Sequence, residues 1–331
     1  MERYPWLTKK EINYDFLVEE LSDSTRTNQF SNFGPANNRL ENIARKKLKI
    51  DKEYDIIACS SGTGALHAII HTFQAIKEND LRIANQAFTF PSNAQGPCQG
   101  SIFVDFDDEF NFDLTDKNLE HANVIIVTNI FGHLQKLTKM VNYAKSNNKF
   151  LVFDNAATPY SFYEGTNSCN IPDASFISLH HTKPIGFGEG GLAIVKKEYS
   201  DTLRNVINFG WKNGEFNERG GNYKMSDISA AAILQYWRQF DMDQMMKVYL
   251  DNYYDLLYKL KMKIGVIQYQ NYGDMDAFLP ACLPVLLTET VNISDAIETK
   301  KYYKPLVNLR NSSFIFDRII CFPVHERIND I

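Results

Sequence analysis

The lysine at position 183 is the residue whose type and surroundings point most clearly to chemistry. It lies in Ser178-Leu-His-His-Thr-Lys-Pro-Ile-Gly-Phe-Gly-Glu-Gly-Gly191, among histidines, a proline and four glycines. A lysine that is partly removed from water loses its proton more easily, and its amine can then form a Schiff base with a carbonyl compound. A surface lysine in a glycine-rich loop is the alternative, but the crowded small residues favour the reactive interpretation.

Two further polar segments follow apolar runs. In Ser60-Ser-Gly-Thr-Gly64, small residues between a strand and a helix leave N–H groups that favour a phosphate. A tight turn with a serine or threonine N-cap explains the same residues equally well. Asp154 ends the run Phe150-Leu-Val-Phe, where a carboxylate could balance a protonated cofactor nitrogen. From its position alone, an N-cap or a solvated strand end is slightly favoured.

The glycines of residues 186–191 also match the dinucleotide pattern G-x-G-x-x-G. That fingerprint follows a strand and opens a helix, whereas this segment precedes the strand-like Leu192-Ala-Ile-Val. A nicotinamide-dependent oxidoreductase is therefore disfavoured. Neither serine of the Ser60-Ser61 pair lies in a Gly-x-Ser-x-Gly elbow, and nothing at metal-ligand spacing accompanies the two histidines, so we expect neither a hydrolase triad nor a metal site.

The elements that must position these residues alternate along the chain. An alternation of short apolar strands with helices predicts an α/β fold with a mostly parallel sheet, whose ligands bind where strands end. A boundary near Phe240 would separate a large domain, 1–240, from a smaller α+β domain, 241–331, on which the N-terminal segment is expected to pack. Strands are expected at 55–60, 101–105, 123–128, 150–154, 174–178 and 192–195, and helices from 35, after 64, at 134–147, from 226 and at 244–261.

The composition excludes several classes of protein. The 331 residues include 35 Lys+Arg and 40 Asp+Glu, a net charge of −5, which argues against nucleic-acid binding. No apolar run reaches the length of about 18 residues that a membrane span needs, and the first residues do not resemble a signal peptide. Five scattered cysteines without a Cys-x-x-Cys pair indicate core residues in a reducing cytoplasm.

Taken in order, these segments resemble the sugar aminotransferases of the DegT/DnrJ/EryC1/StrS family, which have the fold-type-I aspartate aminotransferase architecture. The resemblance spans nearly the whole chain, from Asn32-Phe-Gly-Pro35 to Cys321-Phe-Pro-Val-His325. The matching segments are Ser60-Ser-Gly-Thr-Gly-Ala-Leu-His67, Phe88-Thr-Phe90, Phe153-Asp-Asn-Ala-Ala157, the lysine segment 178–191 and Gly220-Gly-Asn-Tyr-Lys-Met225.

This resemblance implies a pyridoxal 5'-phosphate (PLP) enzyme. Lys183 would bind the aldehyde of PLP covalently, and Asp154 would pair with the pyridine nitrogen and keep it protonated. Asn222 would reach the phosphate from the partner subunit, which implies a homodimer with two shared active sites. The other implied cofactor contacts are a backbone phosphate cradle at Thr63 and Gly64, a hydroxyl at Ser178 and a stacking ring at Phe90.

The implied substrates are a nucleotide-linked keto sugar and L-glutamate. Lysine rather than histidine at 183 favours transamination over the dehydratase branch. The lysine segment looks most like viosamine synthases, which aminate C4 of dTDP-4-keto-6-deoxyglucose for surface polysaccharide such as O-antigen. A C3-aminating enzyme and a non-catalytic PLP-binding relative are the alternatives. Sugar-side contacts are expected at Asn32, Phe33, Gly34, His180 and Lys224, and Ala157 departs from the family by replacing a polar residue.

Overall fold

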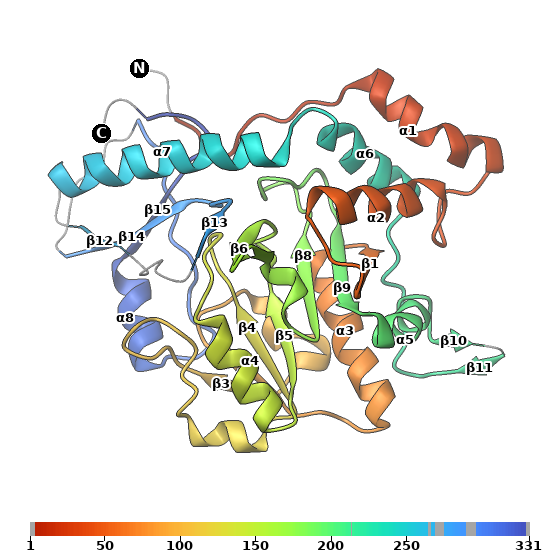
Figure 1. Cartoon of the computed structure of the whole chain (residues 1–331), viewed down its shortest axis with the longest axis horizontal. Helices are drawn as coiled ribbons and strands as arrows, with labels where there is room; N and C mark the ends of the chain where they lie inside the picture. Colours follow the sequence, from red (N-terminus) through yellow and green to blue (C-terminus); the bar gives the residue numbers. More distant parts are fainter. Residues whose placement is uncertain (1–3, 213, 264–265, 269–274, 289–295, 329–331) are drawn as a thin grey trace.

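A seven-stranded mixed sheet forms the centre of the computed structural model, which describes residues 4–212, 214–263, 266–268, 275–288 and 296–328 (Figure 1). The strand order is β1-β9-β8-β5-β4-β2-β3. The strands are β1 (Tyr54–Cys59), β2 (Ile83–Gln86), β3 (Ile102–Val104), β4 (Val124–Thr128), β5 (Phe150–Asp154), β8 (Ala174–Ser178) and β9 (Gly191–Lys196).

The sheet is mostly parallel, as the sequence predicts. β3, β2, β4, β5 and β8 run parallel to one another, whereas β9 pairs antiparallel with both β8 and β1. No helix separates β8 from β9, so the chain returns through the loop 179–190 beside the strand it has just left. That loop contains the lysine segment, and both of its ends are therefore fixed to the sheet.

Helices cover both faces of the sheet because strand side chains point alternately to opposite faces. Ile57 and Ala193 pack with helices α3 and α5 on one face, whereas Ile56 and Ile194 pack with α2 and α6 on the other, which α4 also covers. The bounds are α2 (Pro35–Lys47), α3 (Gly62–Lys77), α4 (Leu137–Ser146), α5 (Lys197–Ile207) and α6 (Asp227–Trp237).

The sequence pattern does not predict helix α1 (Tyr14–Thr27), strand β2 or helix α5, and the structure shows why. Helix α1 buries the polar residues Glu20 and Ser24 rather than an apolar stripe. Glu20 pairs with Arg39 at 2.9 Å. Strand β2 carries the fully buried Asn85 and Gln86, so it lacks an apolar run. Helix α5 follows β9 directly, and no capping side chain marks its start.

The C-terminal part builds smaller layers beside the main sheet. One core cluster contains Tyr253 and Leu260 of α7 together with Leu40 and Ile194 of the predicted large domain. The core is therefore continuous across Phe240, and the division into two domains at that residue stays a prediction. The N-terminal segment reaches this part through a bridge from Tyr4 to Ile297. The remaining elements are α7 (Met242–Lys263), α8 (Arg310–Arg318), the sheet β12 (Val266–Gln268), β14 (Leu283–Leu287) and β15 (Ile319–Phe322), the sheet β13 (Ala277–Phe278), β6 (Ser161–Tyr163) and β7 (Thr166–Asn167), and the hairpin β10 (Trp211–Lys212) and β11 (Glu215–Phe216).

Within the described part of the chain, no helix is both long enough and apolar enough to cross a membrane. All five cysteines are buried and unpaired by disulfides, in agreement with their expected role as core residues.

Candidate active site

The segments singled out in the sequence meet at the carboxyl edge of the sheet. β5 ends in Asp154, β8 ends in Ser178 five residues before Lys183, and β1 leads into helix α3. Together they enclose a cavity of about 390 Å³. We call it the inner cavity, and its lining comprises Ser61, Gly62, Thr63, Phe90, Ser92, Thr128, Asn129, Ile130, Asp154, Ala156, Ala157, Phe176, Ser178, His180, Thr182, Lys183, Glu189 and Tyr303.

The Asp154 carboxylate is almost fully buried and is held by three neutral donors. Its Oδ2 accepts from Asn93 Nδ2 at 3.1 Å and from Thr128 Oγ1 at 3.4 Å, and its Oδ1 accepts from the backbone N–H of Ala156 at 3.0 Å. Burial raises the pKa of this carboxyl, and the donors and Lys183 oppose that rise. A buried carboxylate with neutral donors is suited to a cationic ligand group in the cavity.

Asn93 and Thr128 hold the Asp154 carboxylate, although the sequence patterns single out neither of them. Asn93 is fully buried, and its amide also donates to Thr89 Oγ1 at 2.9 Å. It lies three residues after Phe90, in a short turn of 3-10 helix that only the neighbouring aromatic motif marks. Thr128 ends strand β4, so the rule that polar groups at strand ends line the site could have found it.

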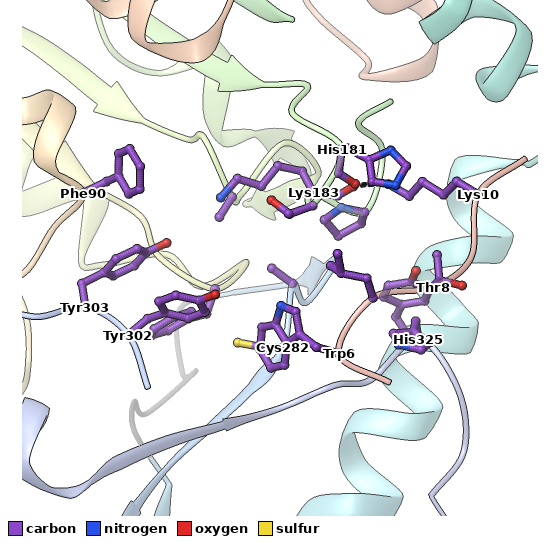
Figure 2. Close-up of a pocket in the computed structure, with 17 residues that line it drawn as sticks. Trp6, Thr8, Lys10, Phe90, His181, Lys183, Cys282, Tyr302, Tyr303 and His325 are labelled. Atoms are coloured by element: carbon purple, nitrogen blue, oxygen red, sulfur yellow. Dashed lines mark hydrogen bonds between the residues drawn. The ribbon is translucent and has the colours of Figure 1, made fainter. Parts of the chain in front are cut away.

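Lys183 lies in the loop between β8 and β9, where its side chain is only partly accessible. Lys183 lines the inner cavity. In Figure 2 its side chain extends away from Lys10 and toward Phe90. Burial lowers the pKa of the Lys183 amine, and the Asp154 carboxylate opposes this shift. The larger effect favours the neutral amine, which is the nucleophilic form.

The N-terminus of α3 forms one wall of the inner cavity, which we call the anion-binding wall because free N–H groups and the helix dipole favour an anion there. Ser61 is the N-cap, and its Oγ accepts from the N–H of Gly64 at 3.0 Å, so the capping alternative holds for this serine. Gly62 and Thr63 begin the helix, and their N–H groups have no carbonyl one turn earlier in the helix. A Cβ on Gly62 would lie 3.0 Å from the Cβ of Ser178, so the glycine lets β8 approach the helix. Of the predicted phosphate contacts, Thr63 and Ser178 line the inner cavity, whereas Gly64 does not.

Aromatic rings close the side of the cavity that faces the C-terminal part. The Phe90 side chain is 54% exposed and meets the Tyr303 ring edge to face, with centroids 6.4 Å apart. Tyr303 lines the cavity although no sequence motif surrounds it. A half-exposed ring in a cavity wall can stack on a planar ligand.

His180 is the one predicted sugar-side residue that lines the inner cavity. Its Nδ1 lies 2.8 Å from Thr182 Oγ1, and its Nε2 lies 3.3 Å from a Glu189 oxygen. These contacts hold the imidazole at the cavity edge.

The other predicted sugar-side residues line neither the inner cavity nor the smaller cavity that adjoins it. Asn32 and Phe33 form the turn before α2 with positive φ, and Gly34 packs against Asp227. Lys224 Nζ lies 4.1 Å above the Phe209 ring and has no hydrogen-bond partner in the described ranges. Asn222 is exposed, outside the cavity of its own chain. Roles for these residues stay predictions.

A second, smaller cavity of about 150 Å³ adjoins the first. We call it the outer cavity. Phe90, Ala157, Thr182, Lys183 and Tyr303 line both cavities, so Lys183 lies at their junction. The outer walls come from the two ends of the chain: Trp6, Leu7, Thr8 and Lys10 belong to the N-terminal segment, and Cys282, Tyr302 and His325 belong to the C-terminal part (Figure 2).

Comparison with known proteins decides the family. The model of the DegT/DnrJ/EryC1/StrS aminotransferase family matches residues 12–330. The chain belongs to this family. The family, fold, enzyme class and PLP cofactor expected from the sequence are confirmed by this match together with the solved PLP-dependent aminotransferases described below.

This family member has distant curated relatives. It is 22% identical over 303 residues to a UDP-4-amino-4,6-dideoxy-N-acetyl-beta-L-altrosamine transaminase of Campylobacter jejuni (serotype O:23/36, strain 81-176), covering 82% of this chain and 80% of the relative. It is 26% identical over 249 residues to the GDP-perosamine synthase of Escherichia coli O157:H7, covering 72% of this chain and 65% of that protein.

Solved structures share the fold. A protein from Bacillus cereus ATCC 10987 assigned as a PLP-dependent aminotransferase superposes with a TM-score of 0.82 at 23% identity, covering 99% of this chain and 96% of that one. DesI, solved with its TDP-sugar product, gives a TM-score of 0.81 at 17% identity over 98% and 88% of the two chains.

Proposed function

We propose that this aminotransferase uses PLP to move the amino group of L-glutamate onto a keto sugar linked to a nucleotide. The observation that carries the proposal is that Lys183, Asp154 and the N-terminus of α3 line one cavity. An amine, a buried carboxylate and an anion-binding wall fit three of the polar groups of PLP, namely its aldehyde, its pyridine nitrogen and its phosphate. The exposed Phe90 ring fits its plane.

The chain's own residues each have a defined task. PLP, when bound, supplies an electron sink. Asp154 would stabilise the protonated pyridine nitrogen, and Asn93, Thr128 and the N–H of Ala156 stabilise the ionised form of Asp154. Burial lowers the pKa of Lys183 Nζ and so favours its nucleophilic form, and this amine can accept and return a proton within the cavity.

The anion-binding wall would anchor the cofactor phosphate. The N–H groups of Gly62 and Thr63 and the positive end of the α3 dipole favour a dianion. Ser178 Oγ accepts weakly from the N–H of His180 at 3.3 Å, so its proton is available to a phosphate oxygen. With the phosphate held at this wall, Phe90 would contact the ring and Asp154 would pair with its nitrogen.

For the sugar, we propose dTDP-4-keto-6-deoxyglucose aminated at C4. The name of the Campylobacter relative contains a 4-amino-4,6-dideoxy sugar, which supports C4 over C3. The names of the relatives carry UDP and GDP, and that of DesI carries a TDP-sugar, so these nucleotides are the competing choices. A non-catalytic relative is disfavoured because the Lys183, Asp154 and Ser178 set is intact. The product would serve surface polysaccharide synthesis, and the free cysteines suit a reducing cytoplasm.

We also propose that the protein works as a homodimer. Asn222 is exposed, and large apolar side chains that are exposed in the single chain lie near it in sequence at Phe209, Trp211 and Phe216. A second copy that covered these side chains could present Asn222 to the phosphate of its partner's cofactor. Light scattering should give the mass of two chains, and Asn222→Ala should weaken PLP binding without changing that mass.

The direct test is an activity assay. The PLP-loaded protein is mixed with L-glutamate, and 2-oxoglutarate is measured; the same protein is then given dTDP-, UDP- and GDP-linked 4-keto-6-deoxy sugars and a 3-keto isomer. We expect 2-oxoglutarate and an aminated sugar, with C4 identified by NMR. Lys183→Ala is the control. PLP-loaded protein that yields no 2-oxoglutarate, or yields as much with Lys183→Ala, contradicts the proposal.

A further inference from the structure

The ammonium group of Lys10 binds the backbone of the loop that carries Lys183. Lys10 Nζ donates to three carbonyl oxygens, those of His181 at 2.8 Å, Lys183 at 2.6 Å and Gly186 at 2.6 Å. An ammonium group has three N–H donors, so this geometry uses all of them. Figure 2 shows Lys10 approaching the loop from the side opposite to the one toward which the Lys183 side chain extends.

The carbonyls of Pro184 and Ile185, which lie between the acceptors at Lys183 and Gly186, are bound by side chains of helix α6. Tyr236 Oη donates to the carbonyl of Pro184 at 3.1 Å, and Trp237 Nε1 donates to that of Ile185 at 2.7 Å. Four consecutive carbonyls, from Lys183 to Gly186, are thus bound by side chains from outside the loop. Lys10 is the member of this set that comes from a different part of the chain, the N-terminal segment.

Lys10 also lines the outer cavity, together with Trp6, Leu7 and Thr8. Its Nζ lies 4.9 Å from the centre of the Tyr236 ring. Burial lowers the pKa of Lys10 to about 8, so its ammonium form prevails at neutral pH. The loop is closely packed at this point, because a Cβ on Gly186 would clash with the carbonyl oxygen of His180.

We propose that Lys10 is a positioning residue for transamination: its ammonium group fixes the backbone of the Lys183 loop and thereby sets the direction of the Lys183 amine toward the cofactor. The proposal rests on the proposed function, since it concerns the same lysine. It assigns the N-terminal segment, which the sequence motifs do not mark, a part in the active site.

The test compares Lys10→Met with Lys9→Met in the full-length, PLP-loaded protein. Met keeps most of the apolar stem of lysine and removes all three donors. Lys9 is the matched control, since its exposed side chain pairs with Glu11. Three quantities are measured per PLP-bound site: kcat and KM for glutamate, and the pH titration of the bound cofactor's absorbance, which reports the surroundings of the Lys183 nitrogen.

We expect Lys10→Met to lower kcat by up to about 100-fold, the loss that a misplacement of about 1 Å can cause, with KM little changed and the absorbance titration shifted. Lys9→Met should match wild type, and Lys10→Arg should recover part of the loss. Equal kcat and equal titrations in Lys10→Met and Lys9→Met overturn the proposal. If Lys10→Met does not fold, Lys10→Gln is compared with Lys10→Arg, and equal turnover in that pair overturns it. Wild-type protein that does not bind PLP through Lys183 refutes the proposed function instead.

Discussion

The hydroxyl group of Ser178 offers a sharp test of the anion-binding wall. Ser178→Ala removes a single oxygen, whose one described partner is the N–H of His180 at the long distance of 3.3 Å. The cofactor-free protein should therefore lose little stability, about 0.5–1 kcal/mol for a weak neutral hydrogen bond. A hydrogen bond to a phosphate dianion is worth about 1.5–3 kcal/mol, so PLP should bind about 10- to 150-fold more weakly at 1.4 kcal/mol per tenfold.

Ser175→Ala is a matched control because it makes the same substitution in the same strand. Ser175 is fully buried, donates to the carbonyl of Cys169 at 3.4 Å and does not line the inner cavity. PLP affinity is measured by absorbance titration of the cofactor-free proteins, and stability by urea unfolding. We expect Ser175→Ala to bind PLP as wild type does. Equal PLP affinities for the two variants would refute the assignment of this wall to the phosphate.

Two further predictions concern Asp154. Asn93→Ala removes a donor to the carboxylate and should lower kcat, with the cofactor's pyridine nitrogen titrating at lower pH; an unchanged nitrogen titration in ¹⁵N NMR contradicts this role. In the cofactor-free protein the pKa of Asp154 is raised, so the stability from this group is complete below its unfolded pKa of about 3.9 and is lost as pH rises through the folded pKa. Asp154→Asn cannot ionise, so wild-type stability relative to this variant should fall over that window in urea unfolding, and parallel pH curves would count against it.

The main sheet and the reactive centre could be predicted because their signals are local. Asp154 and Ser178 end apolar strands, and Lys183 follows within five residues of one of them. Parallel strands bring such ends to one edge, so sequence order is enough to place these residues together. The pattern for β2 fails because Asn85 and Gln86 are buried through hydrogen bonds, for example from Asn85 Nδ2 to the carbonyl of Asn93 at 2.7 Å.

Contacts made across long sequence separations could not be predicted. Tyr303 comes from the C-terminal part and Lys10 from the N-terminal segment, and neither lies in a pattern that marks a site. Gly34 and Lys224 lie in matching segments, yet each contacts its own chain away from the cavities, and Asn32 is exposed; their roles stay predictions. A motif indicates which residues belong to a family, whereas the packing of distant segments decides which of them reach the site.

The central claim concerns the nitrogen of Lys183, and chemical trapping tests it most directly. PLP-loaded protein is reduced with borohydride, digested and mapped by mass spectrometry. We expect a pyridoxyl group on Lys183 in nearly every molecule and its loss in Lys183→Arg. A label on another lysine, or a cofactor that leaves the protein unmodified after reduction, would show that Lys183 is not the residue that binds PLP.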